Sequence, residues 1–165
     1  MVHWRMERCL GQPHPTAYPE PALTDPLLIT DLTEDQLRHA WRWIVEESYW
    51  GARIPWDTFS RACAGSLCFG LVEDDRLLAF ARVVTDGATF AWLCDVFVDQ
   101  GARGRGLGKT LMTGIMADDR LQGLRRWGLA TADAHGLYEQ YGFETADPVR
   151  HMEKVDRDIY PRLEV

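Results

Sequence analysis

The sequence predicts an α/β (α+β) fold in which helices flank a mixed, mostly antiparallel sheet. Three β-rich runs follow one another between residues 66 and 98, separated only by short turn-forming stretches. This spacing is typical of three antiparallel strands in a meander. Helical periodicity precedes the meander at 34–48 and follows it at 107–119. This order of segments favours one sheet with helices packed on it.

The N-terminal part divides into a leader and the start of the folded domain. Five of the eight prolines lie between Pro13 and Pro26, so residues 1–26 are expected to form a proline-rich, poorly ordered leader. We expect residues 27–165 to form a single domain. The domain is expected to open with a short strand at 27–32.

Two helices are expected next. Thr33 and Gln36 have the spacing of a capping box, and apolar residues recur at helical spacing behind them, which predicts a helix over 34–48. A second, shorter helix is expected to begin near Pro55, because proline suits the first position of a helix. It is expected to end near Gly65.

The rest of the chain alternates between predicted strands and helices. Strands are expected where β-branched and aromatic residues concentrate, and helices where apolar residues recur every three or four positions. The expected strands are 66–72, 76–85, 89–98, 125–131 and 149–155, and the expected helices are 107–119 and 133–141.

The composition limits the classes of function. The net charge of −7 argues against binding to nucleic acid, which needs a cationic face. No apolar run approaches the roughly 18–20 residues that span a bilayer, and the N-terminus lacks the apolar core of a secretory signal. A cytoplasmic protein without nucleic-acid or membrane partners is therefore expected. The four cysteines, Cys9, Cys63, Cys68 and Cys94, form no Cys-x-x-Cys pair, so they predict reduced thiols and no metal site.

The glycine-rich stretch at 101–111 carries the strongest functional signal. Residues 108–110 match the end of a Walker A loop, but position 103, which must be glycine, is arginine. A dinucleotide-binding fingerprint that begins at Gly106 requires glycine or alanine at position 111, which is leucine. Neither of these two phosphate-binding loops is present.

The centre of this stretch still has the residues of an anion-binding loop. The segment Arg103-Gly104-Arg105-Gly106-Leu107-Gly108 lies directly after a predicted strand and directly before a predicted helix. Glycines let the backbone approach a ligand closely, and free N–H groups at the start of a helix bind anions. With three cationic side chains around it, from Arg103, Arg105 and Lys109, the loop suits a pyrophosphate. A plain glycine-rich connector is the alternative.

Two segments together resemble a known family. Residues 103–108 fit the Arg/Gln-x-x-Gly-x-Gly/Ala signature of the GCN5-related N-acetyltransferases (GNAT). The segment "LYEQYGFE" at 137–144 is similar to the Leu-Tyr-x-x-x-Gly-Phe segment that closes the same fold. The resemblance covers 67–155 well and the first helices loosely. It implies a GNAT-like acyl-CoA N-acyltransferase fold and leaves the acceptor subfamily unassigned.

The resemblance implies a site for acetyl-CoA, used as a co-substrate without a metal. In the family, the fourth strand hydrogen-bonds the pantetheine arm like an added strand, and the glycine-rich loop holds the pyrophosphate. The residues of this chain at those positions are Val96, Phe97 and Val98 on the strand and Arg103, Gly104, Arg105, Gly106, Leu107, Gly108, Lys109 and Thr110 in the loop.

The resemblance also implies two catalytic candidates. Tyr138 has the family position of the proton donor to the departing thiolate, and an ordinary tyrosine pKa of about 10 keeps such a group protonated at neutral pH. The strand positions where some members carry a general base are Trp92, Leu93 and Cys94 here, and Asp95 is the nearest carboxylate. Asp95 could equally hold a structural hydrogen bond. A water chain, or an acceptor that arrives neutral, would also serve.

The acceptor is expected to enter over the first two helices and the loop between them. Tyr49, Trp50 and Arg53 lie in this segment and are the candidate substrate-binding residues, since amphipathic rings often line pockets. A small satellite core under the loop is the alternative for the aromatic residues.

The expected function is transfer of an acetyl group from acetyl-CoA to a small-molecule or peptide amine in a ternary complex. A non-catalytic acyl-CoA binding or sensing module of the same fold is the alternative. Either a monomer or a homodimer fits the sequence.

Overall fold

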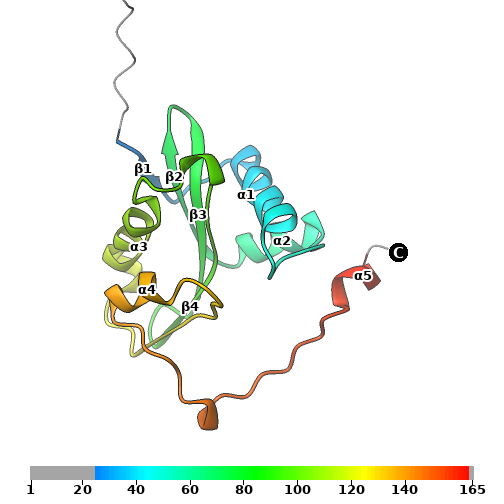
Figure 1. Ribbon diagram of the computed structural model, residues 1–165, viewed down its shortest axis with the longest axis vertical. Helices are drawn as coiled ribbons and strands as arrows, with labels where there is room; N and C mark the ends of the chain where they lie inside the picture. The colour runs from blue at the N-terminus through cyan, green and yellow to red at the C-terminus, as the bar shows by residue number, and fades with distance from the viewer. Residues whose placement is uncertain (1–24, 164–165) are drawn as a thin grey trace, which may run out of the picture.

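The computed structural model describes residues 25–163, so the expected leader at 1–26 lies almost wholly outside the described residues. Within them, the chain forms a sheet with helices on both sides (Figure 1). None of these helices is long and apolar enough to cross a membrane. The strands are β1 (Leu27–Ile29), β2 (Leu67–Glu73), β3 (Arg76–Thr85), β4 (Phe90–Val98) and β5 (Arg126–Gly128), and the α-helices are α1 (Glu34–Glu47), α2 (Trp56–Ala64), α3 (Leu107–Ala117), α4 (His135–Tyr138) and α5 (Ile159–Leu163).

The strands form one sheet in the order β1-β2-β3-β4-β5. Neighbouring strands are antiparallel except β4 and β5, which are parallel. Short turns join β2 to β3 and β3 to β4, as antiparallel neighbours allow, whereas the parallel pair needs a crossover, which α3 provides. The predicted mixed, mostly antiparallel sheet is therefore confirmed.

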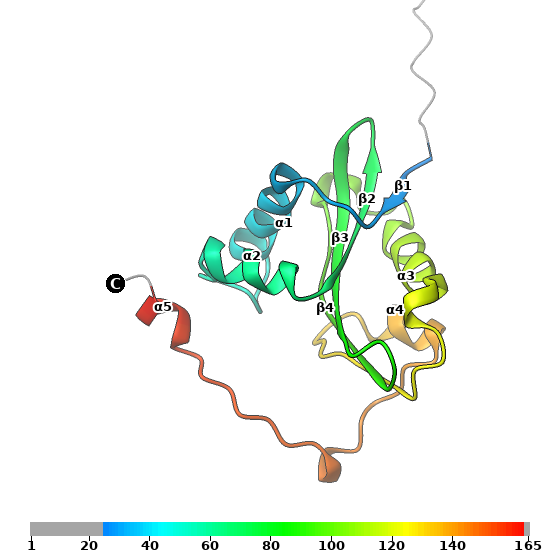
Figure 2. The ribbon, with the colours of Figure 1, turned by 180° about the vertical axis from the view of Figure 1, so that it is seen from behind.

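Helices cover both faces of the sheet (Figures 1 and 2). On one face α1 and α2 enclose a buried cluster that includes Trp43 and Phe80. On the other face α3 buries Leu111 in a second cluster that includes Ala79 and Ala81. Because side chains of a strand point to both of its faces, β3 supplies residues to both clusters. The sheet therefore contributes to two hydrophobic cores, one on each face.

The predicted strand at 149–155 is wrong. Residues Pro148–Arg150 form a turn of 3₁₀ helix, and the chain then runs away from the sheet (Figure 2). Its apolar residues Val149, Met152 and Val155 recur every third position, so they cannot share one face of a strand. Met152 is 99% exposed. Without a neighbouring strand in the described residues, this segment has no ladder to join.

Other predicted elements are present but shorter. β1 ends at Ile29 and β5 ends at Gly128, each three residues before the predicted end. The helix predicted at 133–141 divides into α4 and a 3₁₀ turn at Glu139–Tyr141. Gly142, with a φ of 83°, ends this turn in a conformation that glycine adopts freely.

A bulge in β4 positions the candidate site. Between the cross-strand pairs Phe80–Phe97 and Arg82–Cys94, β4 has one residue more than β3, which is the arrangement of a β-bulge. Asp95 lies in this bulge with a φ of 54°. Aspartate is among the few non-glycine residues that tolerate this left-handed conformation. The bulge therefore changes the direction of β4 at Asp95, a residue type that tolerates the left-handed conformation.

The sheet also opens at β4. β5 pairs with β4 only along Phe90–Trp92, against Arg126–Gly128. From Leu93 to Val98, the edge of β4 that faces β5 is therefore left without a neighbouring strand among the described residues. The Val98 carbonyl accepts a hydrogen bond from Arg103 Nε at 3.2 Å, and the other backbone groups on that side are available to a ligand.

Candidate active site

Two cavities lie along the opened edge of β4 and meet at its bulge. A groove of about 350 Å³ runs over the glycine-rich loop, and a pocket of about 270 Å³ lies beside the loop between α1 and α2. Val96, Ala134 and Tyr138 line both cavities. A ligand in the groove and a ligand in the pocket would therefore meet at these three residues.

The groove brings together most of the residues predicted to bind acetyl-CoA. All of them line it except Phe97, Arg105 and Thr110. The Phe97 side chain points to the opposite face of the sheet, where its ring stacks on Trp43 at 5.4 Å between centroids. Only the backbone of Phe97 could therefore contact a ligand along β4. The lining consists of Val96, Val98, Arg103, Gly104, Gly106, Leu107, Gly108, Lys109, Ala134, Leu137 and Tyr138.

The glycine-rich loop presents backbone donors to the groove. Gly104 and Gly106 both have a φ of 80°, and Gly106 is the residue that precedes α3 and brings no side-chain cap. The first N–H groups of a helix have no partner within the helix, so those of α3 can bind an anion, which the helix dipole also favours. A Cβ atom at either glycine would meet no protein atom within 4 Å. Both glycines thus border open space.

The cationic side chains of the loop have different surroundings. Arg103 and Lys109 line the groove. Arg105 instead extends to the end of β2, where its guanidinium donates hydrogen bonds to the Glu73 carboxylate at 2.5 and 3.1 Å. This contact lowers the pKa of Glu73. Arg105 therefore anchors the loop to the sheet. Arg103 also contacts β4, since its Nε donates to the Val98 carbonyl at 3.2 Å and its guanidinium lies 5.4 Å from the centre of the Phe97 ring.

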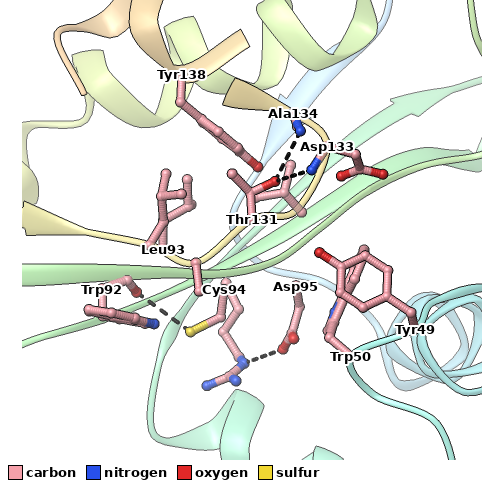
Figure 3. Close-up of a pocket in the computed structure, with 14 residues that line it drawn as sticks. Tyr49, Trp50, Trp92, Leu93, Cys94, Asp95, Thr131, Asp133, Ala134 and Tyr138 are labelled. Carbon is pink, nitrogen blue, oxygen red and sulfur yellow. Dashed lines mark hydrogen bonds and ion pairs between the residues drawn. The ribbon is translucent and has the colours of Figure 1, made fainter. Parts of the chain in front are cut away.

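Tyr138 lies where the groove and the pocket meet. Its side chain is 8% exposed, and its hydroxyl points into the pocket (Figure 3). Burial raises the pKa of Tyr138 to about 12, with smaller contributions from the negative charge of Asp133 and from Tyr49. The hydroxyl therefore keeps its proton at neutral pH and can donate it to a group at the junction.

Asp95 is held in an ion pair. Its carboxylate accepts a hydrogen bond from Arg82 Nε at 2.8 Å, and the same guanidinium donates to the Ser66 hydroxyl at 3.0 Å. Both side chains of the ion pair are mostly buried. Figure 3 shows the Asp95 carboxylate turned to the guanidinium and away from the Tyr138 hydroxyl. The ion pair with Asp95 supplies the partner that a buried charge needs, which explains how β3 holds Arg82 among apolar residues.

The predicted acceptor residues are only partly brought together. Tyr49 and Trp50 line the pocket, with their rings in edge-to-face contact at 4.9 Å. Tyr49 also accepts a hydrogen bond from the backbone N–H of Ala132 at 2.9 Å, which ties the α1–α2 loop to the segment after β5. Arg53 is exposed and does not line this pocket.

Part of the pocket wall was not among the predicted substrate-binding residues. Arg82, Trp92, Thr131 and Asp133 line the pocket together with the residues predicted for it. They come from β3, β4 and the segment after β5, so nothing in their spacing along the chain brings them together. Only the position of Asp133 beside the closing motif at 137–144 could have drawn attention to it.

The cysteines on this side of the sheet form no disulfide with one another among residues 25–163. Cys63, Cys68 and Cys94 are free cysteines, and Cys94 lines the pocket. Burial raises the pKa of Cys94, which disfavours the reactive thiolate. Across residues 25–163, no group of three histidine, cysteine, aspartate or glutamate side chains could hold a metal ion.

Comparisons with known proteins agree with this geometry. The model of the acetyltransferase (GNAT) family matches residues 29–143. A crystal structure of a GNAT-family protein from Xanthomonas campestris, described as an acetyltransferase, is 43% identical, with a TM-score of 0.77 over 84% of this chain and 99% of that one. Glucosamine-6-phosphate N-acetyltransferase from Arabidopsis thaliana, at 17% identity and a TM-score of 0.59 over 80% of this chain and 99% of that one, shares the fold.

Two curated relatives match a shorter part of the chain. A Gibberella zeae protein described as an acetyltransferase is 29% identical over 54% of this chain, and mouse N-alpha-acetyltransferase 80 is 37% identical over 56% of it. The matched part spans 62% of the fungal protein and 32% of the mouse protein. With a family model that covers most of the described residues and a sheet and loop of the expected geometry, this chain belongs to the GNAT family of acetyltransferases.

Proposed function

We propose that this protein is an N-acetyltransferase that moves the acetyl group of acetyl-CoA directly to an amine bound beside it. The observation that carries the proposal is the junction of two cavities at Tyr138. The groove has a helix N-terminus suited to a pyrophosphate. The pocket, which adjoins it at Tyr138, is large enough for a small acceptor. Direct transfer needs both substrates at once, and a continuous cleft can hold both.

The residues of the groove fit coenzyme A. Gly104 and Gly106 leave open the space that a Cβ atom would fill, next to the free N–H groups at the start of α3. Arg103 and Lys109 add positive charge beside them, which suits a pyrophosphate. The open edge of β4, beyond Trp92, suits the amide groups of a pantetheine arm, which can hydrogen-bond along it like an added strand.

The chain has three tasks in the proposed reaction. Acetyl-CoA supplies an acetyl carbonyl that is activated as a thioester. The pocket holds the amine against that carbonyl, which replaces an encounter in solution by a fixed approach. The β4 bulge, at Asp95, disrupts the β3–β4 ladder, so backbone N–H groups there can stabilise the negative charge that develops on the carbonyl oxygen.

Tyr138 completes the proton balance. As the C–N bond forms and the C–S bond breaks, the Tyr138 hydroxyl gives its proton to the departing sulfur. An acceptor that enters as an ammonium ion loses one proton to water in the pocket to become a nucleophile, and a second as the amide forms. Tyr138 then recovers a proton from solvent, so one proton is released in all. The products are an N-acetyl amide and a free thiol.

We assign Asp95 a positioning role in this proposal. Its carboxylate accepts the Arg82 hydrogen bond and is turned away from Tyr138 (Figure 3). The ion pair holds β3 against the bulge of β4, where the reacting carbonyl would lie. An Asp95→Asn variant, considered in the Discussion, separates this role from that of proton acceptor.

Titration calorimetry with acetyl-CoA, followed by thiol release with a library of primary amines, tests the proposal. We expect binding of acetyl-CoA and thiol release that depends on the amine. Binding without release for any amine would favour the rival function, a non-catalytic acyl-CoA sensor. Absence of binding at millimolar acetyl-CoA would contradict both functions.

A further inference from the structure

We propose that the acceptor is a cationic primary amine with an apolar or aromatic body and no anionic group. In this proposal Asp133 attracts the ammonium group, and the rings of Tyr49, Trp50 and Trp92 contact the body of the molecule. The inference rests on the proposed function, because it concerns the acceptor of that reaction. It is drawn from the charges and rings that line the pocket.

Asp133 supplies a free negative charge. It lines the pocket, and its carboxylate has no hydrogen bond or ion pair within residues 25–163. The Thr131 hydroxyl accepts hydrogen bonds from the backbone N–H groups of Asp133 and Ala134, at 3.4 and 3.1 Å, which holds this turn in place. Its charge reaches the junction, since it contributes to the raised pKa of Tyr138.

The cation of the pocket is already neutralised. Arg82 is the pocket-lining residue with a positive charge, and its guanidinium is paired with Asp95 at 2.8 Å and bonded to Ser66. The pair has no net charge, so Asp133 leaves the described lining with a net charge of about −1. An acceptor carboxylate or phosphate would have to lose its hydration without gaining an unpaired cation, which is unfavourable.

Aromatic rings form the rim of the same pocket. Tyr49, Trp50 and Trp92 are 62%, 44% and 40% exposed, respectively, although each lines the pocket. Exposed rings gathered around a cavity offer apolar area to a ligand, and their faces attract ammonium groups. These rings and one carboxylate are the combination that recognises an organic cation.

A hydrogen bond connects the aromatic rim of the pocket to the segment that carries Asp133. The backbone N–H of Ala132, the residue before Asp133, donates to the Tyr49 hydroxyl at 2.9 Å. Figure 3 shows the Asp133 carboxylate on the side of the pocket where Tyr49 and Trp50 lie. The aromatic and anionic walls come from segments more than eighty residues apart, and this bond holds them together. The charge and the rings therefore act on the same ligand.

Matched pairs of acceptors test the inference. Each pair contains an amine and the amino acid with the same side chain and an added carboxylate, for example tyramine with tyrosine and 1,4-diaminobutane with ornithine. We expect kcat/KM for the amine to exceed that for its carboxylate partner by about tenfold or more, a difference of about 1.4 kcal/mol. The enzyme is used as the full chain.

Charge reversal makes the test specific to Asp133. In an Asp133→Lys variant, the ratio of kcat/KM between amine and amino acid should fall by about tenfold or more, through KM of the amine. Asp119→Lys, the same change at another exposed aspartate outside both cavities, is the control and should leave the ratio unchanged. Calorimetry with acetyl-CoA should give the wild-type affinity for both variants.

The outcomes separate this inference from the function on which it rests. Equal or better use of the carboxylate partners, or a ratio unaffected by Asp133→Lys, would overturn the inference and leave the N-acetyltransferase intact. Acetyl-CoA binding without thiol release from any amine would overturn the proposed function, and the inference with it.

Discussion

The groove and the pocket differ in what they are made of. The groove depends on backbone: two glycines with a φ of 80° and the first N–H groups of α3. The pocket depends on side chains that come from the α1–α2 loop, β3, β4 and the segment after β5. A backbone site is encoded by one short stretch of sequence. A side-chain site of this kind exists only after folding.

In the proposed function, this difference matches the groove to a common co-substrate and the pocket to a specific acceptor. Backbone N–H groups are the same for every residue, so we expect substitutions beside the glycines of the loop to leave its donors in place. The pocket changes its charge and shape with each substitution. Removing single groups on either side, and at Tyr138 between them, should therefore have different consequences.

The largest effect is expected at Tyr138, which belongs to both cavities. Tyr138→Phe removes the proton donor and should lower kcat by about 10²-fold or more, with the affinity for acetyl-CoA little changed. Because the pKa of Tyr138 is raised to about 12, the hydroxyl stays protonated as the pH rises from 7 to 10. The ratio of wild-type to variant kcat should be constant across this range. A ratio that falls towards one at pH 9 would show that the donor titrates earlier or lies elsewhere.

The next effect is expected at the ion pair of the pocket. Asp95→Ala leaves the mostly buried Arg82 guanidinium without its partner and places alanine at a φ of 54°. We expect a loss of about 3 kcal/mol in the free energy of unfolding, measured by urea denaturation. Asp95→Asn keeps a hydrogen-bond acceptor and tolerates the left-handed conformation, so about 1 kcal/mol should be lost.

The same asparagine variant distinguishes positioning from proton transfer. If Asp95 positions the bulge, Asp95→Asn should reduce kcat by less than about tenfold. A reduction of about 10²-fold or more in a folded variant would instead identify Asp95 as the proton acceptor.

A smaller effect is expected in the groove, where alanine substitutions at two nearby glycines, Gly106 and Gly108, can be compared. Gly106→Ala forces alanine to a φ of 80° and puts a methyl group into open space beside the helix N-terminus. We expect the Kd for acetyl-CoA to rise by about tenfold, or about 1.4 kcal/mol. Gly108 lies inside α3, and a Cβ there would contact Leu137 at an ordinary 3.6 Å.

Gly108→Ala is therefore the control for the loop. Alanine has the higher helix propensity and needs no strained φ here, so the affinity of this variant for acetyl-CoA should fall less than that of Gly106→Ala. Equal weakening of binding by both variants would mean that bulk in the groove, and not the conformation of Gly106, controls binding.

The sequence predicted the groove better than the pocket for the same physical reason. Glycine spacing and helix position are local, so the loop at 103–110 could be read directly. Phe97 shows the limit of this reasoning, because its neighbours on β4 face the groove while its ring lies in the other core. The pairing of Arg82 with Asp95 depends on the register of β3 and β4, which the structure shows and no local pattern encodes.

The secondary structure likewise was predicted well where it depends on local sequence and poorly where it depends on contacts between distant segments. The capping box of Thr33 and Gln36 and the meander turns are local signals, and the elements that they predict are present. The length of β5 depends on where it parts from β4, which no local pattern encodes. The tail at 149–155 has strand-forming residues but an apolar spacing of three, and this spacing should have outweighed composition.

The smallest effect is expected at Tyr49, whose hydroxyl joins the two walls of the pocket. Tyr49→Phe removes the acceptor of the Ala132 N–H hydrogen bond but keeps the ring that lines the pocket. An exposed hydrogen bond of this kind contributes about 0.5–1 kcal/mol, so KM for the amine should rise about two- to fivefold while the Kd for acetyl-CoA stays constant. Trp50→Phe retains that bond and loses ring area, and should raise KM for large amines more than for small ones. If Tyr49→Phe instead weakened acetyl-CoA binding, the two cavities would be coupled through the segment after β5, and the backbone site would depend on the side-chain site after all.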